Sequence, residues 1–400
     1  RSCVSSLVGF GAGINWKVHN NSATNLVRAL AERVYKVQGP GGILVPTPQP
    51  QPGAFARLNE FGNLIQKWLP VTAPVDYETF VGYYRGPKRT VYEKAVQSLL
   101  GKSVCRTDAQ ICAFVKAEKI NTTKKPDPAP RLIQPRSPRY NVAVGVFLRP
   151  LEKLVYRAIG KVWGGKTVLK GMNASEQAAE LEEMWHTFHD PVAVGLDASR
   201  FDQHVSADAL RWEHSVYLRC FRGEHKHLLE RLLRWQIANK GRAYTADAKI
   251  KYSVDGCRMS GDINTSLGNC LLMCALVWAW CKAKGVKARL ANNGDDCVVV
   301  MSRRDLLKFQ EGLTEWFLEC GFEMVVEDPV YTFEEIVFCQ TQPVWTPDGW
   351  LMVRQVDTAV SKDLVTLLNM PASYQAYVGA IGECGLNAYG GVPVFQEFYK

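Results

Sequence analysis

The distribution of apolar residues along the chain predicts a mixture of helices and short strands. Residues 54–69 place apolar side chains three and four positions apart, so we expect an amphipathic helix with Phe61 and Ile65 on its buried face. Residues 263–283 are apolar on nearly all sides, which is typical of a helix enclosed in a core. Helical spacing also occurs at residues 171–189, 207–220 and 225–239.

Strand-like segments lie between these helices. Residues 192–196 form a short apolar run after Pro191, and residues 290–300 predict a hairpin that turns at Asn293-Gly294-Asp295. Helices and strands in this order indicate an α/β (α+β) fold. The other expected features are a hairpin at residues 337–353 that turns at Pro347-Asp348-Gly349, a helical and then loop-like final fifty residues, and an extended Gly/Pro-rich surface arm at residues 38–53.

The net charge of +9 favours an anionic partner such as nucleic acid or an acidic membrane surface, although solubility alone can also account for it. The charge is concentrated, because residues 116–139 carry seven basic side chains against two acidic ones. The longest uninterrupted apolar run, residues 270–281, is twelve residues and too short to span a bilayer. A length of 400 residues predicts one sizeable core with two or three lobes.

The cysteines and histidines do not follow a disulfide or zinc-binding pattern. The twelve cysteines include no Cys-x-x-Cys pair and several lie within apolar runs, so we expect reduced, buried thiols in a cytosolic protein. His186 and His189, like His225 and His227, lie on polar helical segments without accompanying cysteines, so they are interpreted as surface residues. The absence of a P-loop and of a Gly-x-Ser-x-Gly motif disfavours a helicase or an esterase.

Two clusters of carboxylates lie at the ends of apolar strands. Asp197 follows residues 192–196, and Asp295 and Asp296 precede the apolar residues 297–300. If the strands are neighbours, the three aspartates converge, and their ionised forms would be costly without cations to pair with. Such oxygen ligands suit two Mg²⁺ or Mn²⁺ ions in nucleotidyl transfer. Gly-Asp-Asp alone is a weak signal that also fits a plain hairpin turn, but the two clusters together favour the catalytic interpretation.

Polar residues between the two clusters are spaced for the start of a helix. Thr265 and Asn269 lie four positions apart and share one helical face. Ser260 and Gly261 precede that helix, where glycine permits close approach of a backbone. One interpretation is a helix N-terminus capped by Asp262 or Ser260. The other is a set of groups that contact a nucleotide, and the two interpretations can coexist.

Lys116 and Arg131 flank the basic, Pro-rich loop. Arginine makes bidentate contacts to phosphate oxygens and lysine acts as a point charge, so such a loop can clamp a nucleoside triphosphate. The alternative interpretation is a solvated basic loop without a ligand.

These motifs together resemble the viral RNA-dependent RNA polymerases, most closely those of plant positive-strand viruses of the tombusvirus and carmovirus kind. The resemblance rests on Asp-Ala-Ser-Arg-Phe-Asp-Gln-His at 197–204, on Ser-Gly-Asp-Ile-Asn-Thr-Ser-Leu-Gly-Asn at 260–269 and on Asn-Gly-Asp-Asp-Cys at 293–297. Lys-Ala-Glu at 116–118 and Pro-Ala-Pro-Arg-Leu-Ile at 128–133 extend it. It covers roughly residues 110 to 345.

The resemblance implies a role for each candidate site residue. Asp197 and Asp295 would be the principal ligands of two Mg²⁺ or Mn²⁺ ions, with Asp296 as an auxiliary ligand. The nucleotide would be held at its triphosphate by Lys116 and Arg131, around its ribose 2′-hydroxyl by Asp202, Thr265 and Asn269, and at the base or template by Ser260 on a mobile loop.

By the same resemblance the fold would be a right hand with an antiparallel palm sheet backed by helices. Phe338-Cys339-Gln340 looks like the family's primer-grip strand, and the cation that protonates pyrophosphate is sought among Arg303, Arg304 and Lys308. The expected parts are fingers with an N-terminal arm bridging fingers to thumb at 1–189, palm at 190–207, fingers at 208–255, palm at 256–345 and a small thumb at 346–400.

The expected partners are template and product RNA, nucleoside triphosphates, and viral or host replication proteins. Because the chain begins at Arg1 rather than Met, we expect it to be part of a longer product. Membrane contact is then expected only through a missing N-terminal part or a partner. The expected location is the host cell cytoplasm, in membrane-associated replication complexes.

Two other functions compete with this interpretation. A reverse transcriptase would share the metal-binding aspartates, but its position five after the first aspartate is usually a bulky gate, and here it is Asp202. An inactive RNA-binding scaffold could keep the fold, but the intact Asp197, Asp295 and Asp296 argue against it.

Overall fold

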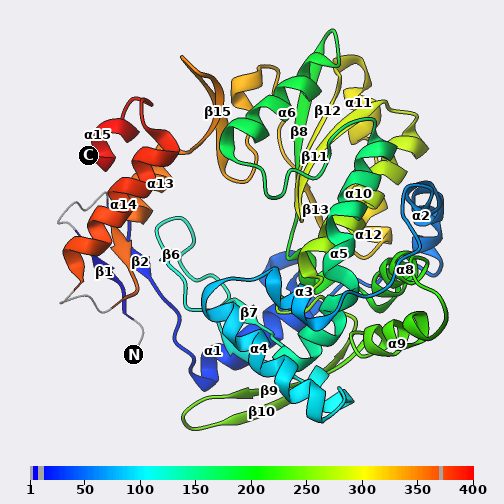
Figure 1. Ribbon diagram of the computed structural model, residues 1–400. Coiled ribbons are helices and arrows are strands. Elements are labelled where there is room, and N and C mark those ends of the chain that lie inside the picture. Colours follow the sequence, from blue (N-terminus) through cyan, green and yellow to red (C-terminus); the bar gives the residue numbers. More distant parts are fainter. Residues whose placement is uncertain (1–2, 8–12, 369–372) are drawn as a thin grey trace.

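A computed structural model describes residues 3–7, 13–368 and 373–400 (Figure 1). Helices surround two four-stranded sheets, so the expectation of a mixed α/β fold is confirmed. The α-helices are α1 (Ala23–Leu30), α2 (Asn59–Gln66), α3 (Tyr77–Gly82), α4 (Gly86–Gly101), α5 (Pro138–Trp163), α6 (Ala174–His186), α7 (Phe201–His204), α8 (Ala207–Leu218), α9 (Gly223–Arg234), α10 (Thr265–Lys284), α11 (Leu306–Gln310), α12 (Leu313–Glu319), α13 (Val356–Asp363), α14 (Tyr374–Tyr389) and α15 (Phe395–Tyr399).

The first four-stranded sheet, here called the central sheet, has the order β11-β12-β8-β13 and is antiparallel throughout. Successive side chains of a strand point to opposite faces. Val194 of β8 therefore packs with α5 and α10, whereas Ala193 packs with α6. Figure 1 shows α6 on one side of this sheet and α10 with α5 on the other. Its strands are β8 (Pro191–Ala198), β11 (Ala288–Asn293), β12 (Asp296–Ser302) and β13 (Met324–Val326).

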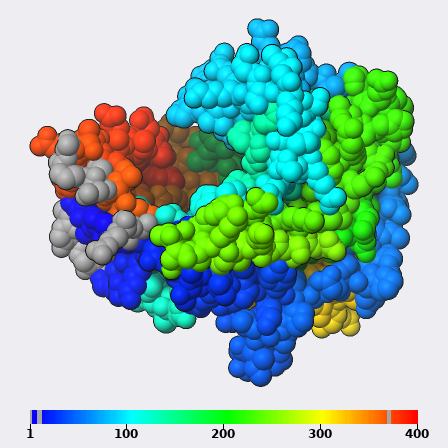
Figure 2. Space-filling view, turned by 90° about the horizontal axis from the view of Figure 1, so that it is seen from below, coloured from blue at the N-terminus to red at the C-terminus, as the bar shows by residue number. Residues whose placement is uncertain are grey.

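The second four-stranded sheet has the order β10-β9-β5-β7 and joins segments that are far apart in the sequence. Strand β5 pairs in parallel with β9 and antiparallel with β7. Among the described residues, α1 and the π-helical turn Ala31–Tyr35 that follows it cover one face of this sheet. Figure 2 shows β9 and β10, in yellow-green, lying across the surface of the molecule. The strands are β5 (Ile111–Val115), β7 (Leu132–Ile133), β9 (Ala238–Tyr244) and β10 (Lys249–Asp255).

Four two-stranded pairs complete the strand pairing of the described residues. Near the N-terminus, one strand pairs with a strand close to the C-terminus, and the next pairs with the basic loop. The N-terminal segment therefore pairs both with the C-terminal part of the chain and with the basic loop, as an arm. The pairs are β1 (Ser5–Ser6) with β16 (Val365–Thr366), β2 (Trp16–Lys17) with β6 (Ile120–Asn121), β3 (Lys36–Gln38) with β4 (Leu44–Pro46), and β14 (Thr341–Thr346) with β15 (Gly349–Arg354).

Most elements expected from the apolar pattern are present. The amphipathic segment begins with a 3₁₀ turn at Ala54–Leu58 and continues as α2, with Phe61 and Ile65 fully buried. The hairpin at Gly294 and the strand that leads to Asp197 are confirmed. Helix α10 is the expected core helix.

Several expectations about local structure were wrong. The segment at 38–53 is not simply extended, because Gly41 and Gly42 at positive φ allow its first half to close the β3–β4 hairpin. The helix expected to reach Asn239 ends at Arg234, since its last residues pair in β9 instead. The chain ends in a helix, α15, rather than a loop.

The expected primer-grip strand at Phe338-Cys339-Gln340 is not a strand. Cys339 and Gln340 have positive φ values of 52° and 62°, which are incompatible with an extended ladder. Phe338 makes an isolated bridge to Thr341, so the segment is a tight turn that leads into β14.

The cysteine and membrane expectations need adjustment. All twelve cysteines are free, as expected, but Cys3, Cys112 and Cys384 are exposed rather than buried. Among the described residues, α10 alone is long and apolar enough to cross a membrane by length and composition, and 78% of its apolar window is buried inside the protein. The uninterrupted apolar run is shorter than this helix because Thr265, Ser266 and Asn269 lie within the helix.

A buried ion pair ties α8 to the loop that precedes α10. The side chains of Glu213 and Arg258 are both fully buried and pair through two contacts, one of which is 3.2 Å long between Nη1 and Oε1. Asn264 and Tyr217 also donate to the Glu213 carboxylate. The pair lies against Gly268 of α10, where a Cβ atom would come within 2.5 Å of Glu213 and closer to Arg258. Helix α10 needs glycine there so that the pair can approach it.

We predict that Glu213→Leu lowers the free energy of unfolding by roughly 3–5 kcal/mol, because it leaves the Arg258 guanidinium buried without its counter-charge. The double variant Glu213→Leu/Arg258→Met should recover most of the loss, since apolar side chains of similar volume can replace a buried pair. Urea unfolding of both variants measures this. The exposed pair on α8 supplies a control, and Asp208→Asn should change stability by about 1 kcal/mol at most.

Candidate active site

Strand pairing in the central sheet brings the two carboxylate clusters together. Asp197 on β8 lies directly opposite Asp296 on β12 in the antiparallel register. Opposed residues of such a pair have Cβ atoms about 5 Å apart on the same face. Asp295 lies in the turn between β11 and β12, where Gly294 has a φ of 88°. The Asn292 side chain braces this turn by donating to the Gly294 carbonyl oxygen at 2.7 Å.

The three carboxyl groups repel one another. Burial raises the pKa of Asp295, and Asp197 raises it further. Burial also raises the pKa of Asp296, together with Asp295 and Asp197. Lys170 opposes both shifts. The raised pKa values mean that the ionised carboxyl groups are unfavourable without a nearby positive charge. A bound cation would favour the ionised form, so the cluster has the electrostatics expected of a cation site.

The donor set fits Mg²⁺ or Mn²⁺, although the side chains do not form a ready-made cage. Among the described residues, no group of three His, Cys, Asp or Glu side chains is already arranged to hold a metal ion. Mg²⁺ usually binds through one or two carboxylates, with waters and substrate phosphates as its other ligands. An open cluster of hard oxygen donors therefore suits such an ion, and Asp197, Asp295 and Asp296 are the residues that could hold it.

A chain of hydrogen bonds connects the buried ion pair to Asp202. Arg258 Nε donates to Asn269 Oδ1 at 3.0 Å, and Asn269 Nδ2 donates to Asp202 Oδ1 at 2.8 Å. Burial raises the pKa of Asp202, and the bond from Asn269 and the charge of Arg258 oppose the rise. Two of the three predicted sugar-contacting residues, Asp202 and Asn269, therefore lie in direct contact, with their orientation fixed from the core.

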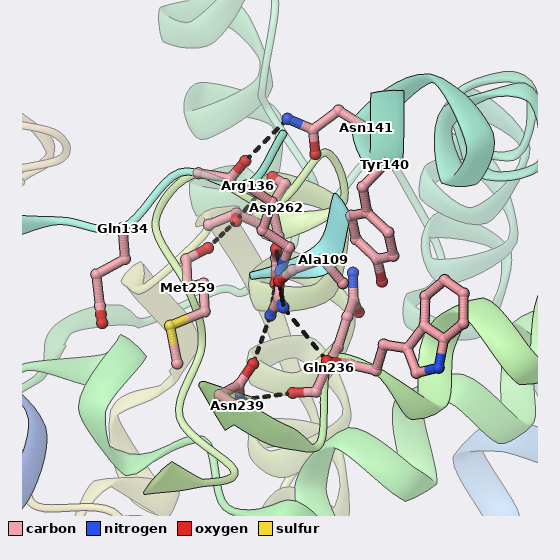
Figure 3. Close-up of polar contacts among 12 residues, drawn as sticks. Ala109, Gln134, Arg136, Tyr140, Asn141, Gln236, Asn239, Met259 and Asp262 are labelled. Carbon is pink, nitrogen blue, oxygen red and sulfur yellow. Dashed lines mark hydrogen bonds and ion pairs between the residues drawn. The ribbon is translucent and has the colours of Figure 1, made fainter. Parts of the chain in front are cut away.

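The loop before α10 is held by a second buried ion pair (Figure 3). Arg136 pairs with Asp262, and it also donates to Ala109 O and to Asn239 Oδ1, each at 2.7 Å. Gly261 lies against Pro135, whose Cα would be 2.4 Å from an added Cβ. The loop therefore packs tightly on the segment that follows the basic loop.

The capping interpretation of this loop was wrong, because both side chains have other partners. The residue before α10 is Asn264, whose side chain makes no cap bond, and the Asp262 carboxylate is used by Arg136. Ser260 Oγ accepts from the backbone N–H of Gln134 at 3.1 Å. Thr265 donates to the Met259 and Asp262 carbonyl oxygens, so its hydroxyl hydrogen is engaged by the backbone.

The basic residues predicted to bind phosphate lie side by side. The backbone N–H of Lys116 donates to the Arg131 carbonyl at 2.8 Å, at the end of the β5–β7 pair. Both side chains also pair with Glu118, at 3.1 and 3.3 Å. Arg131, Asp202, Ser260 and Asp295 line one cavity of about 140 Å³, which Lys116, Thr265 and Asn269 do not line.

Sequence reasoning missed three arginines of this cavity, Arg33, Arg200 and the Arg258 of the buried ion pair. Arg33 comes from the turn after α1, and burial together with Arg200 and Arg131 lowers its pKa to about 10. Its Nε has no hydrogen-bond partner. Arg200 has a left-handed φ of 50° and donates to the Glu32 carbonyl oxygen. Arg200 lies within the motif 197–204 and could have been singled out, whereas nothing in the sequence marks Arg33.

The cations considered for protonating pyrophosphate are far from the carboxylates. Arg303 follows the end of β12, seven positions after Asp296, which at about 3.3 Å per residue is some 20 Å away. Arg303 stacks on Tyr331, and Lys308 donates to the Gly285 carbonyl oxygen. This placement does not support Arg303, Arg304 or Lys308 in that role.

A family model described as viral RNA-dependent RNA polymerase matches residues 1–400. The chain belongs to this family, and the resemblance to polymerases of the tombusvirus and carmovirus kind is confirmed.

Curated relatives from plant viruses are similar over nearly the whole chain. The RNA-directed RNA polymerase of maize chlorotic mottle virus (isolate United States/Kansas/1987) is 49% identical over 399 residues, which cover 99% of this chain and 41% of the relative. That of tobacco necrosis virus (strain D) is 48% identical, covering 98% and 54%. That of turnip crinkle virus is 46% identical, covering 98% and 50%. The chain spans about half the length of the curated relatives it matches.

We predict that Asp295→Asn raises the melting temperature at pH 7 when divalent ions are absent. A carboxyl group whose pKa is raised in the folded state costs stability once the pH exceeds that pKa, and asparagine removes the charge. The gain should shrink as the pH falls toward 4, where both folded and unfolded forms become protonated. Thermal melts over this pH range measure it.

When divalent ions are present, we expect the wild type to have a higher melting temperature than Asp295→Asn. Mn²⁺ should raise the melting temperature of the wild type more than that of Asp295→Asn, because the variant has lost one anionic ligand. An equal response of the two proteins to Mn²⁺ would remove Asp295 from the metal site.

Proposed function

We propose that this chain is the catalytic region of an RNA-dependent RNA polymerase. The observation that carries the proposal is the pairing of Asp197 with Asp296 beside Asp295, in a chain that belongs to the viral polymerase family. The reaction is attack of an RNA 3′-hydroxyl on the α-phosphate of a nucleoside triphosphate, directed by an RNA template, with release of pyrophosphate.

The three aspartates act by holding cations. Two bound Mg²⁺ or Mn²⁺ ions would lower the pKa of the attacking 3′-hydroxyl and neutralise charge on the leaving pyrophosphate. Asp197 and Asp295 serve as the principal ligands and Asp296 as an auxiliary one. The pairing of β8 with β12 sets the distance between Asp197 and Asp296. Hydrophobic clusters on both faces of the central sheet hold these two strands in place.

The cationic wall of the cavity receives the triphosphate. Arg131, Arg33 and Arg200 line the cavity, and Lys116 lies beside Arg131 at the end of β5. Glu118 now pairs with both Lys116 and Arg131, so a triphosphate must displace it. The unpartnered Nε of Arg33 is a further donor for phosphate oxygens.

The sugar end of the cavity distinguishes ribose from deoxyribose. Asp202 accepts one hydrogen bond from Asn269 and has further lone pairs for a 2′-hydroxyl. Ser260 lines the same cavity and contacts the nucleotide or the template. Thr265 contributes indirectly. Its hydroxyl donates to the Met259 and Asp262 carbonyl oxygens and so stabilises the loop before α10.

RNA binding is supported by a row of cations on α5. These residues recur every fourth position, so they lie on one face of the helix. Tyr156, next to Arg157 in α5, has its hydroxyl oxygen 3.3 Å from that of Ser266, so this part of α5 lies beside the start of α10. The members of the row are Arg149, Lys153, Arg157 and Lys161.

The parts of a polymerase right hand map onto the fold as follows. The central sheet is the palm, from residues 190–207 and 256–345. The second sheet joins residues of 1–189 to residues of 208–255, which is the pattern expected if both belong to the fingers. Residues 346–400 form the small thumb, which the N-terminal arm reaches through the β1–β16 pair.

The remaining proposals concern the cellular setting. The polymerase works with viral or host replication proteins in the host cell cytoplasm, in membrane-associated complexes. The relatives are about twice as long as this chain, so a longer product offers room for such contacts.

Two rival functions remain open to test. A reverse transcriptase is disfavoured because Asp202 presents a carboxylate, not a bulky gate, at the sugar end of the cavity. An inactive scaffold is disfavoured because all three aspartates are retained on paired strands.

We predict that Asp295→Asn lowers primer extension on an RNA template at least about a hundredfold, because loss of a cation ligand removes several kcal/mol of transition-state stabilisation. Extension is measured with four ribonucleotides and Mg²⁺, with and without primer, on protein whose folding is verified by circular dichroism. Glu315→Gln, on the exposed surface of α12, is the matched control. Near-normal extension by Asp295→Asn would contradict the two-metal assignment, and no extension by the wild type would favour the scaffold.

We predict that Asp202→Ala reduces the preference for UTP over its 2′-deoxy analogue by roughly tenfold to a hundredfold. A hydrogen bond to a charged group contributes about 1.5–3 kcal/mol, and only the ribose substrate uses it. The measurement is kcat/KM for both substrates at fixed Mg²⁺. An unchanged ratio in a folded, active variant would show that Asp202 does not sense the sugar.

A further inference from the structure

A second cavity lies where the ends of α5, α6 and α10 meet the start of β11, and it is here called the β11 cavity. Its volume of about 550 Å³ is within the range of small-molecule sites. The lining combines aromatic rings with cations, namely Trp163, Phe188, Trp278, Lys282, Lys287 and Arg289.

The β11 cavity is separate from the candidate active site. Arg289 is the second residue of β11, and Asp295 follows six positions later. At about 3.3 Å per residue along a strand, the two residues are about 20 Å apart. No residue that lines the β11 cavity also lines the cavity at the aspartates.

Arg289 is a buried cation whose charge is poorly compensated. The residue is 7% exposed, and its Nε and Nη2 atoms have no hydrogen-bond partner among the described residues. Its Nη1 atom donates to Thr187 Oγ1 at 3.3 Å and lies 3.6 Å from the Glu183 carboxylate, which is 64% exposed. Because native proteins pair nearly all of their buried donors, the two free nitrogen atoms indicate a ligand that accepts hydrogen bonds.

Trp163 supplies a third free donor to the same cavity. Its ring is buried, and a buried indole N–H usually has an acceptor. Among the described residues, eight buried side-chain nitrogen or oxygen atoms have no hydrogen-bond partner, and three of them belong to Arg289 and Trp163. All three are donors, so the cavity requires acceptors and not further donors.

The arrangement of these donors favours phosphate. Nε and Nη2 share one edge of the planar guanidinium group, so two oxygen atoms of one oxyanion can accept from both. A carboxylate has no third oxygen for the indole N–H, whereas a phosphate group has one. Lys287 is exposed and has no ion-pair partner in the part of the chain that the structure describes, so it adds uncompensated positive charge.

The guanidinium group is placed so that it can turn toward a ligand. It lies against Gly165, where an added Cβ atom would be 2.1 Å from Nη2. Its free edge is therefore under the cavity wall, and a phosphate would draw the end of this long side chain into the cavity. The rings of Phe188 and Trp278 would then contact the rest of an organic phosphate.

We propose that the β11 cavity binds the phosphate group of a small molecule. Arg289 donates from its free edge, Trp163 donates from its indole, and Lys287 contributes charge. Inorganic phosphate and a nucleoside monophosphate share this chemistry. The site goes beyond the proposed function, because it uses no residue of the candidate active site and requires no RNA.

The test is equilibrium dialysis of the 400-residue chain against radiolabelled inorganic phosphate and, separately, uridine monophosphate, without divalent ions. The wild type should show saturable binding. Arg289→Met should weaken it at least about tenfold, since hydrogen bonds to a charged group are lost. The melting temperature of this variant without ligand should equal or exceed that of the wild type, because an apolar side chain replaces a poorly compensated buried charge.

A milder substitution tests the site without removing a charge. Trp163→Phe keeps an aromatic ring and removes the N–H, so it should weaken phosphate binding roughly twofold to tenfold. Arg211→Gln removes an exposed cation of α8 and should leave the affinity unchanged, which controls for net charge. Arg131→Gln controls for phosphate bound in the cavity at the aspartates, and it should also leave the affinity for inorganic phosphate unchanged.

The two ligands distinguish the sources of the phosphate group. Tighter binding of uridine monophosphate, lost in Arg289→Met, would support a nucleotide site, and equal binding of the two ligands would support a site for free phosphate. Wild-type affinity in both Arg289→Met and Trp163→Phe would overturn the proposal, as would a loss in Arg131→Gln that Arg289→Met does not share. The free donors would then be bonded to water. None of these results depends on primer extension, so they leave the test of the proposed function independent.

Discussion

The candidate active site depends on two guanidinium–carboxylate pairs that are shut away from water. Arg258 pairs with Glu213, and Arg136 pairs with Asp262, on either side of the loop that leads into α10. Separating the partners of such a pair would leave a buried charge without compensation, which is strongly destabilising. The loop is therefore fixed by electrostatics rather than by its own short sequence, and the start of α10 is fixed with it.

The aspartate cluster follows the opposite principle. Within the described part of the chain its three carboxylates form no ion pair, and burial together with their mutual repulsion raises the pKa values of Asp295 and Asp296. The central sheet supplies the stability that keeps them together, because both of its faces are buried under helices. Rigid packing thus holds a charge arrangement that would otherwise spread apart, as preorganised metal sites require.

The sequence predicted the regular elements and the carboxylate cluster, because periodicity and local motifs determine both. Strand β8, the hairpin at Gly294 and helix α10 are each defined by apolar runs of characteristic length. Contacts between distant segments were not predictable in this way. Arg33 reaches the cavity from a turn that carries no motif, and Asp262 pairs with a residue 126 positions away instead of capping its own helix. The turn at Cys339 looked like a strand because its left-handed backbone leaves no trace in hydrophobicity.

Asn269 makes one hydrogen bond in the protein core and another at the sugar end of the cavity, so it couples stability to substrate choice. Its carbonyl oxygen accepts from the buried Arg258, and its amide donates to Asp202 at the cavity. A substitution there changes a core contact and the sugar end of the cavity in the same step. Variants with relaxed substrate choice would therefore tend to be less robust proteins as well. As the chain evolves, fewer mutations would then be able to change nucleotide selection without also lowering the stability of the protein.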